Sequence, residues 1–206
     1  MTSGKFIVVE GIDGSGKTTQ TKLLEERLGE MGIQTILTRE PGGTELGERL
    51  RTFAFANKFP SDLDSCLMYS ARLLNLEQTI RPALECGIWV ICDRFTSSTW
   101  AYQSGASIDV LVALDKALVN SGLPMPDLEF FLTLDHATSA ARRRNRAGDA
   151  VRFEEQLEVT ERAYASRYRE HPPAWPVKEI YAGQGLAKVT DAIMTNIIEL
   201  VSLPRS

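Results

Sequence analysis

Short apolar runs alternate along the chain with longer segments in which apolar residues recur every three or four positions. The runs are rich in β-branched and aromatic residues and predict strands at 5–10, 34–38, 89–92, 129–134 and 177–181. The longer amphipathic segments predict helices at 18–28, 45–54, 62–84, 108–119, 139–144, 154–169 and 186–200. Such alternation favours an α/β fold whose parallel sheet carries helices on both faces.

Polar residues gather at the points where three of the predicted strands end. Residues 11–18 follow the first strand, Arg39 and Glu40 follow the second, and Asp93 and Arg94 follow the third. Ligands of open parallel sheets bind outside the carboxyl ends of the strands. We therefore expect the binding site at this edge of the sheet.

The segment after the first strand reads G-I-D-G-S-G-K-T and fits the phosphate-binding pattern G-x-x-x-x-G-K-[ST] at every fixed position. Its glycines let the backbone wrap closely around phosphates, and its amides and the helix N-terminus favour an anion. An ordinary glycine-rich turn is the alternative, and the strand before and helix after the segment argue against it. The expected ATP-binding residues are Gly11, Gly14, Ser15, Gly16, Lys17, Thr18 and Thr19.

Two members of this segment have expected chemical roles. The Lys17 ammonium can reach the β- and γ-phosphates, and the Thr18 hydroxyl can bind Mg²⁺. The third strand, W-V-I-C-D, ends in Asp93, and an acid at this point holds Mg²⁺ directly or through water in phosphate-loop proteins. Because many strands end in Asp as a turn or cap, that reading of Asp93 stays open.

The bulk composition bounds the class of protein. The 206 residues, 43% hydrophobic and 24% charged, suit a single domain over 1–206 with one substantial core. The net charge of −4 argues against nucleic acid as a partner. No apolar run approaches membrane-spanning length, and the N-terminus lacks the apolar core of a signal peptide. Cys66, Cys86 and Cys92 lack metal-type spacing, which indicates free thiols in a reducing, cytoplasmic compartment.

Further motifs give the chain a resemblance to a known family. They are R-E-P-G-G-T at 39–44, D-R-F at 93–95 with A-Y-Q at 101–103, and Arg72 within the long helix. Together with the phosphate loop, these elements resemble those of bacterial-type thymidylate kinases, in order from the N-terminus to about Glu154. The resemblance implies a P-loop three-layer sandwich with a five-stranded parallel sheet in the order 2-3-1-4-5. It also implies transfer of the ATP γ-phosphate to dTMP with Mg²⁺, in a homodimer.

The resemblance further assigns residues to the acceptor nucleotide. Asp13 would lie near the sugar 3′-hydroxyl, with a local hydrogen bond that shapes the loop as the alternative. Arginines suit the acceptor phosphate because guanidinium offers planar, bidentate hydrogen bonds, although Arg51 could also be a surface helix residue. Arg72 would bind the thymine ring, and Tyr102 would lie beside the sugar. The full acceptor set is Asp13, Arg39, Glu40, Arg51, Met68, Tyr69, Arg72, Arg94, Thr99, Tyr102 and Gln103.

A lid is expected at about 139–154, where arginines are dense. The family supplies a catalytic arginine either directly after the loop Asp or from the lid, and position 14 is glycine here. The resemblance therefore places this cation in the lid, and a solvated helix face is the alternative. The expected catalytic residues are Lys17, Asp13, Arg94, Arg143, Arg146 and Arg152, and Glu154 joins Thr18 and Asp93 as a metal residue.

Two positions depart from the family pattern. Met68 stands where a phenylalanine usually stacks on the pyrimidine, and Val151 replaces an Asp near the end of the lid. Met68 keeps open another pyrimidine acceptor, dUMP or a 5-substituted dUMP. A nucleotide switch or binding module is the alternative of a different class. A guanine-reading N-K-x-D motif would favour it, but the closest string, at 57–60, lacks the Asp.

Overall fold

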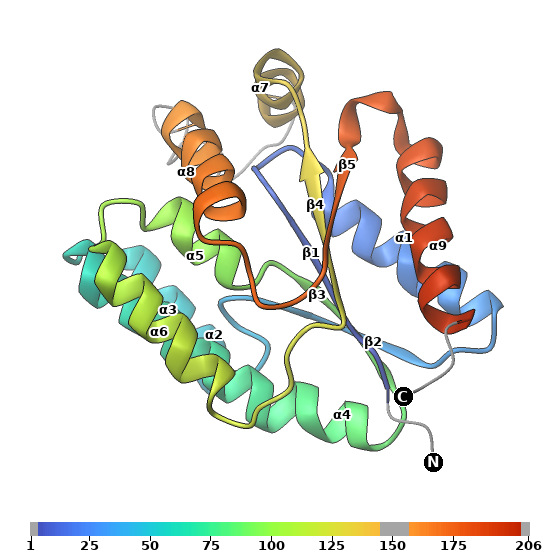
Figure 1. Ribbon diagram of the computed structural model, residues 1–206, viewed down its shortest axis with the longest axis horizontal. Coiled ribbons are helices and arrows are strands. Elements are labelled where there is room, and N and C mark those ends of the chain that lie inside the picture. The colour runs from blue at the N-terminus through green and yellow to red at the C-terminus, as the bar shows by residue number, and fades with distance from the viewer. Residues whose placement is uncertain (1–3, 145–156, 203–206) are drawn as a thin grey trace.

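The computed structural model describes residues 4–144 and 157–202. Five parallel strands form one sheet in the order β2-β3-β1-β4-β5, which confirms the predicted topology. Helices cover both faces of the sheet, so the molecule has three layers (Figure 1). The strands are β1 (Phe6–Gly11), β2 (Thr35–Arg39), β3 (Trp89–Asp93), β4 (Leu128–Thr133) and β5 (Val177–Tyr181).

Two helices, α1 and α9, cover one face of the sheet, and α3 to α6 together with α8 lie on the other side (Figure 1). Crossover connections of this kind bring every strand to the sheet in parallel. The helical elements are α1 (Lys17–Glu30), α2 (Glu45–Ala56), α3 (Ser61–Asn75), the π-helix η1 (Leu76–Ile80), α4 (Arg81–Glu85), α5 (Thr96–Tyr102), α6 (Ile108–Val119), α7 (His136–Arg144), α8 (Leu157–Glu170), the 3₁₀-helix η3 (Ala182–Gln184) and α9 (Leu186–Ser202).

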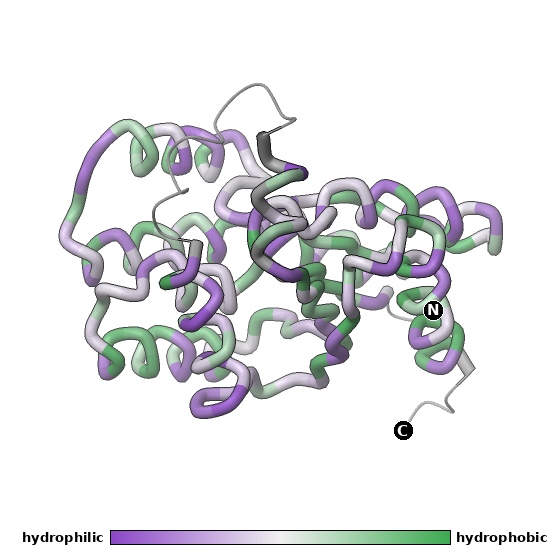
Figure 2. The backbone as a smooth tube through the Cα atoms, turned by 90° about the horizontal axis from the view of Figure 1, so that it is seen from above, coloured by the Kyte–Doolittle hydropathy of each residue, from purple (hydrophilic) through white to green (hydrophobic). Residues whose placement is uncertain are grey.

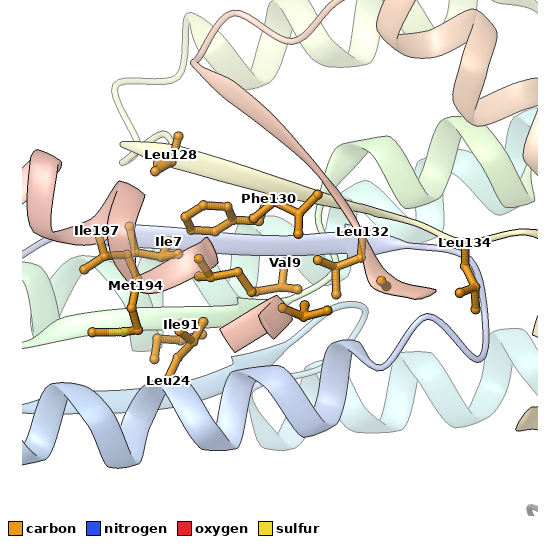
Figure 3. Packing of buried hydrophobic residues seen from close by; sticks show 14 of the residues in the cluster. Ile7, Val9, Leu24, Ile91, Leu128, Phe130, Leu132, Leu134, Met194 and Ile197 are labelled. Carbon is orange, nitrogen blue, oxygen red and sulfur yellow. The ribbon is translucent and has the colours of Figure 1, made fainter. Parts of the chain in front are cut away.

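The central strand β1 contributes to the core on both of its faces. Ile7 and Val9 pack in the cluster beneath α1 and α9, and Phe6 and Val8 pack in the opposite cluster. Figure 3 shows the first cluster, with Leu24 of α1 beside the sheet. A strand buried on both sides has no polar face, which explains its continuous apolar run. The outer helices instead alternate green and purple in Figure 2, as amphipathic helices do.

Three helix assignments differ from the sequence prediction. The helix expected at 62–84 is divided into α3, η1 and α4, because a π-helical turn interrupts its hydrogen-bond pattern. The short α5 was missed, since T-S-S-T-W-A-Y combines weak helix formers with no apolar stripe. Helix α7 begins earlier than predicted, where the Asp135 carboxylate accepts a hydrogen bond from the backbone N–H of Thr138.

Two composition-based expectations can be compared with the described residues. Cys66, Cys86 and Cys92 are all free thiols, and Cys92 is buried in the core. Among the helices of residues 4–144 and 157–202, none is both long and apolar enough to cross a membrane.

Candidate active site

The phosphate loop connects β1 to α1 and depends on glycine. Gly11, Gly14 and Gly16 all have positive φ angles, of 145°, 86° and 96°. A Cβ atom on Gly11 would also come within 2.5 Å of the Leu132 carbonyl oxygen on the neighbouring strand. Larger residues are therefore excluded at these turns. The resulting loop ends at the N-terminus of a helix of 14 residues, an arrangement that attracts phosphate.

Lys17 lies inside this loop rather than in solvent. Its side chain is 6% exposed, and its Nζ atom donates a hydrogen bond of 2.9 Å to the carbonyl oxygen of Ile12. The same atom lies 3.9 Å from Asp13. Burial, followed by repulsion from Arg94, lowers the pKa of Lys17 to about 8. A phosphate bound in the loop would relieve this destabilisation of the ammonium ion.

Thr18 and Asp93 meet at the start of α1 and the end of β3. The Thr18 hydroxyl donates a hydrogen bond of 2.6 Å to Oδ2 of Asp93. The other oxygen, Oδ1, is buried and has no hydrogen-bond partner within the described part of the chain. An unsatisfied carboxylate oxygen beside a hydroxyl fits a magnesium ion, whose remaining ligands are commonly water and substrate phosphates.

Arg94 connects the phosphate loop to α5. It follows β3 with a φ of 77°, a backbone conformation that costs energy for a residue other than glycine. Its guanidinium forms an ion pair with Asp13, donates a hydrogen bond of 3.0 Å to the Ser98 hydroxyl, and lies 4.8 Å from the centre of the Tyr102 ring. The structure thus brings together Asp13, Arg94 and Tyr102.

A buried hydrogen-bond network centred on Glu10 holds Arg94 in place through Ser98 and Tyr164. The fully buried Glu10 carboxylate accepts hydrogen bonds from the Phe95 amide at 2.6 Å, the Ser98 hydroxyl at 2.7 Å and the Tyr164 hydroxyl at 2.9 Å. The Tyr164 oxygen is also 3.5 Å from Arg94. Sequence reasoning missed Glu10, Ser98 and Tyr164. The sequence did contain a signal for this network, namely an acidic residue, Glu10, within an apolar strand. A buried charge requires hydrogen-bond partners, so such a residue predicts a buried polar network.

Arg51 lies near two other cations, Arg39 and Arg94. Arg51 donates a hydrogen bond of 3.0 Å to the carbonyl oxygen of Pro41. Burial lowers its pKa, and the charges of Arg39 and Arg94 lower it further. Arg39 is exposed and bonds to Glu48 at 2.7 Å. Arg51 is therefore half-buried and held by the backbone, and its role as a phosphate-binding residue stays a prediction. A phosphate group between these arginines would relieve their repulsion.

Arg72 occupies a second, fully enclosed position on α3. It is 2% exposed, and its guanidinium lies between the rings of Tyr69 and Phe95, at 4.5 and 5.0 Å from their centres. Its Nε atom donates to Glu40 and its Nη2 atom donates to Thr99 at 3.0 Å. The buried Nη1 atom has no hydrogen-bond partner among the described residues. One donor of a rigidly held arginine is thus left for a ligand.

The neighbours of Arg72 are fixed by packing. Burial raises the pKa of Glu40 to about 7, although the ion pair with Arg72 opposes this shift. The ring of Tyr69 packs in the core, and its hydroxyl bonds to Asp115, so this side chain is held in place from both ends. Met68 is also buried. Gln103, at the end of α5, donates a hydrogen bond of 3.1 Å to Asp64.

Helix α7, which begins the predicted lid, contacts the phosphate loop directly. The Ser139 hydroxyl donates to the Asp13 carbonyl oxygen at 2.8 Å. Arg142 donates to the carbonyl oxygens of Gly14, at 3.4 Å, and Ala182, at 3.1 Å. The Arg143 side chain and residues Arg146, Arg152 and Glu154 lie outside the described part of the chain. Their roles stay predictions.

These features define a class of protein: a P-loop phosphotransferase with a second cationic site beside its phosphate loop. The family profile described as Thymidylate kinase matches residues 9–193. The chain belongs to the thymidylate kinase family.

Known relatives are similar over nearly their whole length. The thymidylate kinase of Ectopseudomonas mendocina is 38% identical, over 96% of this chain and 98% of that protein. That of Alkalilimnicola ehrlichii is 36% identical, over 94% and 92%. That of Hahella chejuensis is 40% identical, over 94% and 95%.

Proposed function

We propose that the protein is an ATP-dependent nucleoside monophosphate kinase that converts dTMP and ATP into dTDP and ADP. Membership of the thymidylate kinase family supports this activity. The observation that carries it is the position of Asp13, whose carboxylate lies 3.9 Å from Nζ of Lys17 and forms an ion pair with Arg94, so that it joins the phosphate loop to a second cation. The loop around Lys17 suits the phosphates of the donor, and the cations Arg39, Arg51 and Arg94 suit the phosphate of the acceptor.

The proposed reaction forms a bond between an acceptor phosphate oxygen and the γ-phosphorus of ATP. The bond from that phosphorus to the β–γ bridging oxygen breaks, and ADP leaves. Such transfers depend mainly on positioning and charge stabilisation, so no general base is required. Lys17 would hold the donor phosphates, and Arg94 would orient the acceptor, with its own position fixed by Asp13 and the Ser98 hydroxyl.

Magnesium belongs to this proposal. Thr18 and Asp93 would hold the ion, because their oxygens lie together and Oδ1 of Asp93 is unsatisfied among the described residues. A bound Mg²⁺ ion would neutralise charge on the ATP phosphates. We extend the proposal to Glu154 as a further metal residue and to a catalytic arginine among Arg143, Arg146 and Arg152, within a lid at about 139–154 of a single domain.

A homodimer in the cytoplasm completes the proposal. Two neighbouring helices expose large apolar side chains: Leu46 and Phe53 on α2, and Leu63 and Leu73 on α3. Exposed apolar residues on adjacent elements favour a protein–protein interface. Sedimentation of the wild type should give a dimer, and Leu63→Asp should shift it toward monomer. A monomeric wild type would contradict this part of the proposal.

A substrate panel tests the proposed activity. Purified protein is incubated with ATP, Mg²⁺ and one of dTMP, dUMP, dCMP, dAMP or dGMP, and ADP formation is followed. We expect dTMP to give the highest kcat/KM. Because Met68 is a flexible thioether and less specific than a flat ring, dUMP should be the second-best substrate. A higher kcat/KM for any purine nucleotide would contradict the proposal.

A further inference from the structure

Two side-chain hydrogen bonds join α3 to α5 and its capping residue. Asp64 accepts from Gln103 at 3.1 Å, and Arg72 donates to Thr99 at 3.0 Å. The α3 residues are eight positions apart with the buried Met68 midway between them. Thr99 of α5 and Gln103, the residue that caps this helix, are four apart. Residues spaced by four lie on one face of a helix. The two hydrogen bonds therefore lie along the same contact between α3 and α5, one on either side of Met68.

The hydrogen bond between Gln103 and Asp64 fixes the orientation of the Gln103 side-chain amide. An ionised carboxylate only accepts hydrogen bonds, so Asp64 requires the NH₂ group of Gln103 to face it. The carbonyl oxygen of Gln103 is then directed away from Asp64 and can only accept. A second bond holds the first turn of α3 against the start of α6, since the Asp62 carboxylate accepts from the backbone N–H of Ser107 at 2.7 Å. The orientation of Gln103 is thus set by a neighbour rather than by the ligand.

Together Arg72 and Gln103 offer one hydrogen-bond donor and one acceptor to a ligand. Nη1 of Arg72 is a buried donor without a partner among the described residues, and the Gln103 carbonyl oxygen is an acceptor. A thymine or uracil ring presents the complement, a carbonyl oxygen beside a ring N–H. Cytosine presents the reverse at the same edge, an amino group beside an unprotonated ring nitrogen. Cytosine would therefore leave both protein groups unsatisfied.

We propose that Asp64 is a positioning residue that makes the site select thymine or uracil over cytosine by fixing the Gln103 amide. The inference rests on the proposed nucleoside monophosphate kinase activity. Sites that hydrogen-bond a substrate group strongly reject analogues that cannot pair with it. The selectivity for dTMP over dCMP should therefore depend on a residue that acts only through Gln103.

The test compares Asp64→Asn with the matched variant Asp62→Asn. Both changes weaken a bond made by the first turn of α3, but Asp64 bonds to Gln103 at the end of α5, whereas Asp62 bonds to Ser107 at the start of α6. An asparagine at 64 can donate as well as accept, so Gln103 becomes free to turn over. The quantity measured is the ratio of kcat/KM for dTMP to that for dCMP. Asp64→Ala and equilibrium binding of both nucleotides provide a second measurement.

We expect Asp64→Asn to lower this ratio about tenfold or more, chiefly by improving the use of dCMP. Asp62→Asn should keep the ratio within about twofold of wild type. An unchanged ratio in both Asp64 variants, or an equal fall in Asp62→Asn, would overturn the inference while leaving the kinase activity intact. A wild type without activity on any nucleoside monophosphate would instead overturn the proposed function, and with it this inference.

Discussion

The hydroxyl of Thr18 and the carboxylate of Asp93 are joined by a hydrogen bond of 2.6 Å between the first helix and the third strand. The pair bridges the phosphate loop and the neighbouring strand end at the edge of the sheet where ligands bind. One Asp93 oxygen is engaged and the other, among the described residues, is not. This relationship gives the most direct structural support for a cation at the site.

Removing the charge at this position should weaken magnesium use. Asp93→Asn keeps the shape of the side chain but loses the negative charge that attracts the ion. We expect the Mg²⁺ concentration for half-maximal activity to rise on the order of tenfold or more. Asp127→Asn, which removes a carboxylate bonded to Lys5 at the opposite edge of the sheet, is the control and should leave this concentration unchanged. Equal magnesium dependence in wild type and Asp93→Asn would refute the assignment.

The burial of Lys17 predicts a pH dependence for ATP binding. Its pKa, lowered to about 8, means that the free protein loses this charge as the pH rises through 8. The phosphates favour the protonated form, so ATP affinity should fall above pH 8, by up to about tenfold per pH unit. Lys17→Ala should bind ATP weakly and with little change between pH 7 and 9.5. Titration calorimetry provides the measurement, and a flat wild-type profile would count against a buried, charged Lys17.

The same pKa shift affects stability. Between about pH 8 and the ordinary lysine value of 10.5, the unfolded chain binds a proton that the folded chain has lost. The contribution of Lys17 to the free energy of unfolding therefore rises with pH over this window, by on the order of 3 kcal/mol. Denaturant titrations should show that Lys17→Met removes this rise relative to wild type. A rise of equal size in both proteins would assign it to other groups.

The Tyr164 hydroxyl should matter for both stability and acceptor binding. Tyr164→Phe removes one hydrogen bond from Glu10 and a contact with Arg94, at a cost of about 1–3 kcal/mol. Tyr168→Phe is a matched control, because that hydroxyl bonds to the buried Glu129 at 2.6 Å and not to Arg94. Both variants should lower the free energy of unfolding. Only Tyr164→Phe should raise the KM for dTMP. If Tyr164→Phe has the same KM as wild type and Tyr168→Phe, the role of Tyr164 is structural.

The lid arginines should act on chemistry more than on affinity. A cation that engages charge developing in the transition state lowers kcat on removal and changes KM only modestly. Single alanine substitutions at 142–144, 146 and 152 should include at least one that lowers kcat about a hundredfold. Arg162→Ala is the control, since that exposed arginine pairs with Glu158 on its own helix. If every lid variant retains wild-type kcat, the arginines form a solvated face.

The sequence predicted the sheet because its strands leave a local signature. The run F-I-V-V in β1 is apolar throughout since both faces are buried, and this pattern needs no knowledge of distant residues. The phosphate loop is likewise local, as glycine spacing determines its path. The missed helix α5 shows the opposite case. Its residues fold as a helix because they are buried between other elements, so tertiary packing overrides weak propensity.

The contacts that orient the side chains of the site could not be predicted from the sequence. Glu10 and Tyr164 are 154 positions apart, and nothing near either residue indicates that they bond. The ion pair between Arg72 and Glu40 was equally hidden, although both residues were assigned to the acceptor. Motifs can identify which residues belong to a site. The rotation of an amide or the free nitrogen of a guanidinium depends on partners that only the folded chain brings together.

The most direct test of this account follows the phosphoryl group itself. Wild type and Lys17→Ala are incubated with Mg²⁺, dTMP and ATP labelled in its γ-phosphoryl group, and the labelled products are separated. We predict that the wild type places the label in dTDP, with one ADP formed per dTDP, and that Lys17→Ala does so at least about a hundredfold more slowly. Label released as inorganic phosphate, with no labelled dTDP, would contradict the account and indicate a nucleotide hydrolase or switch.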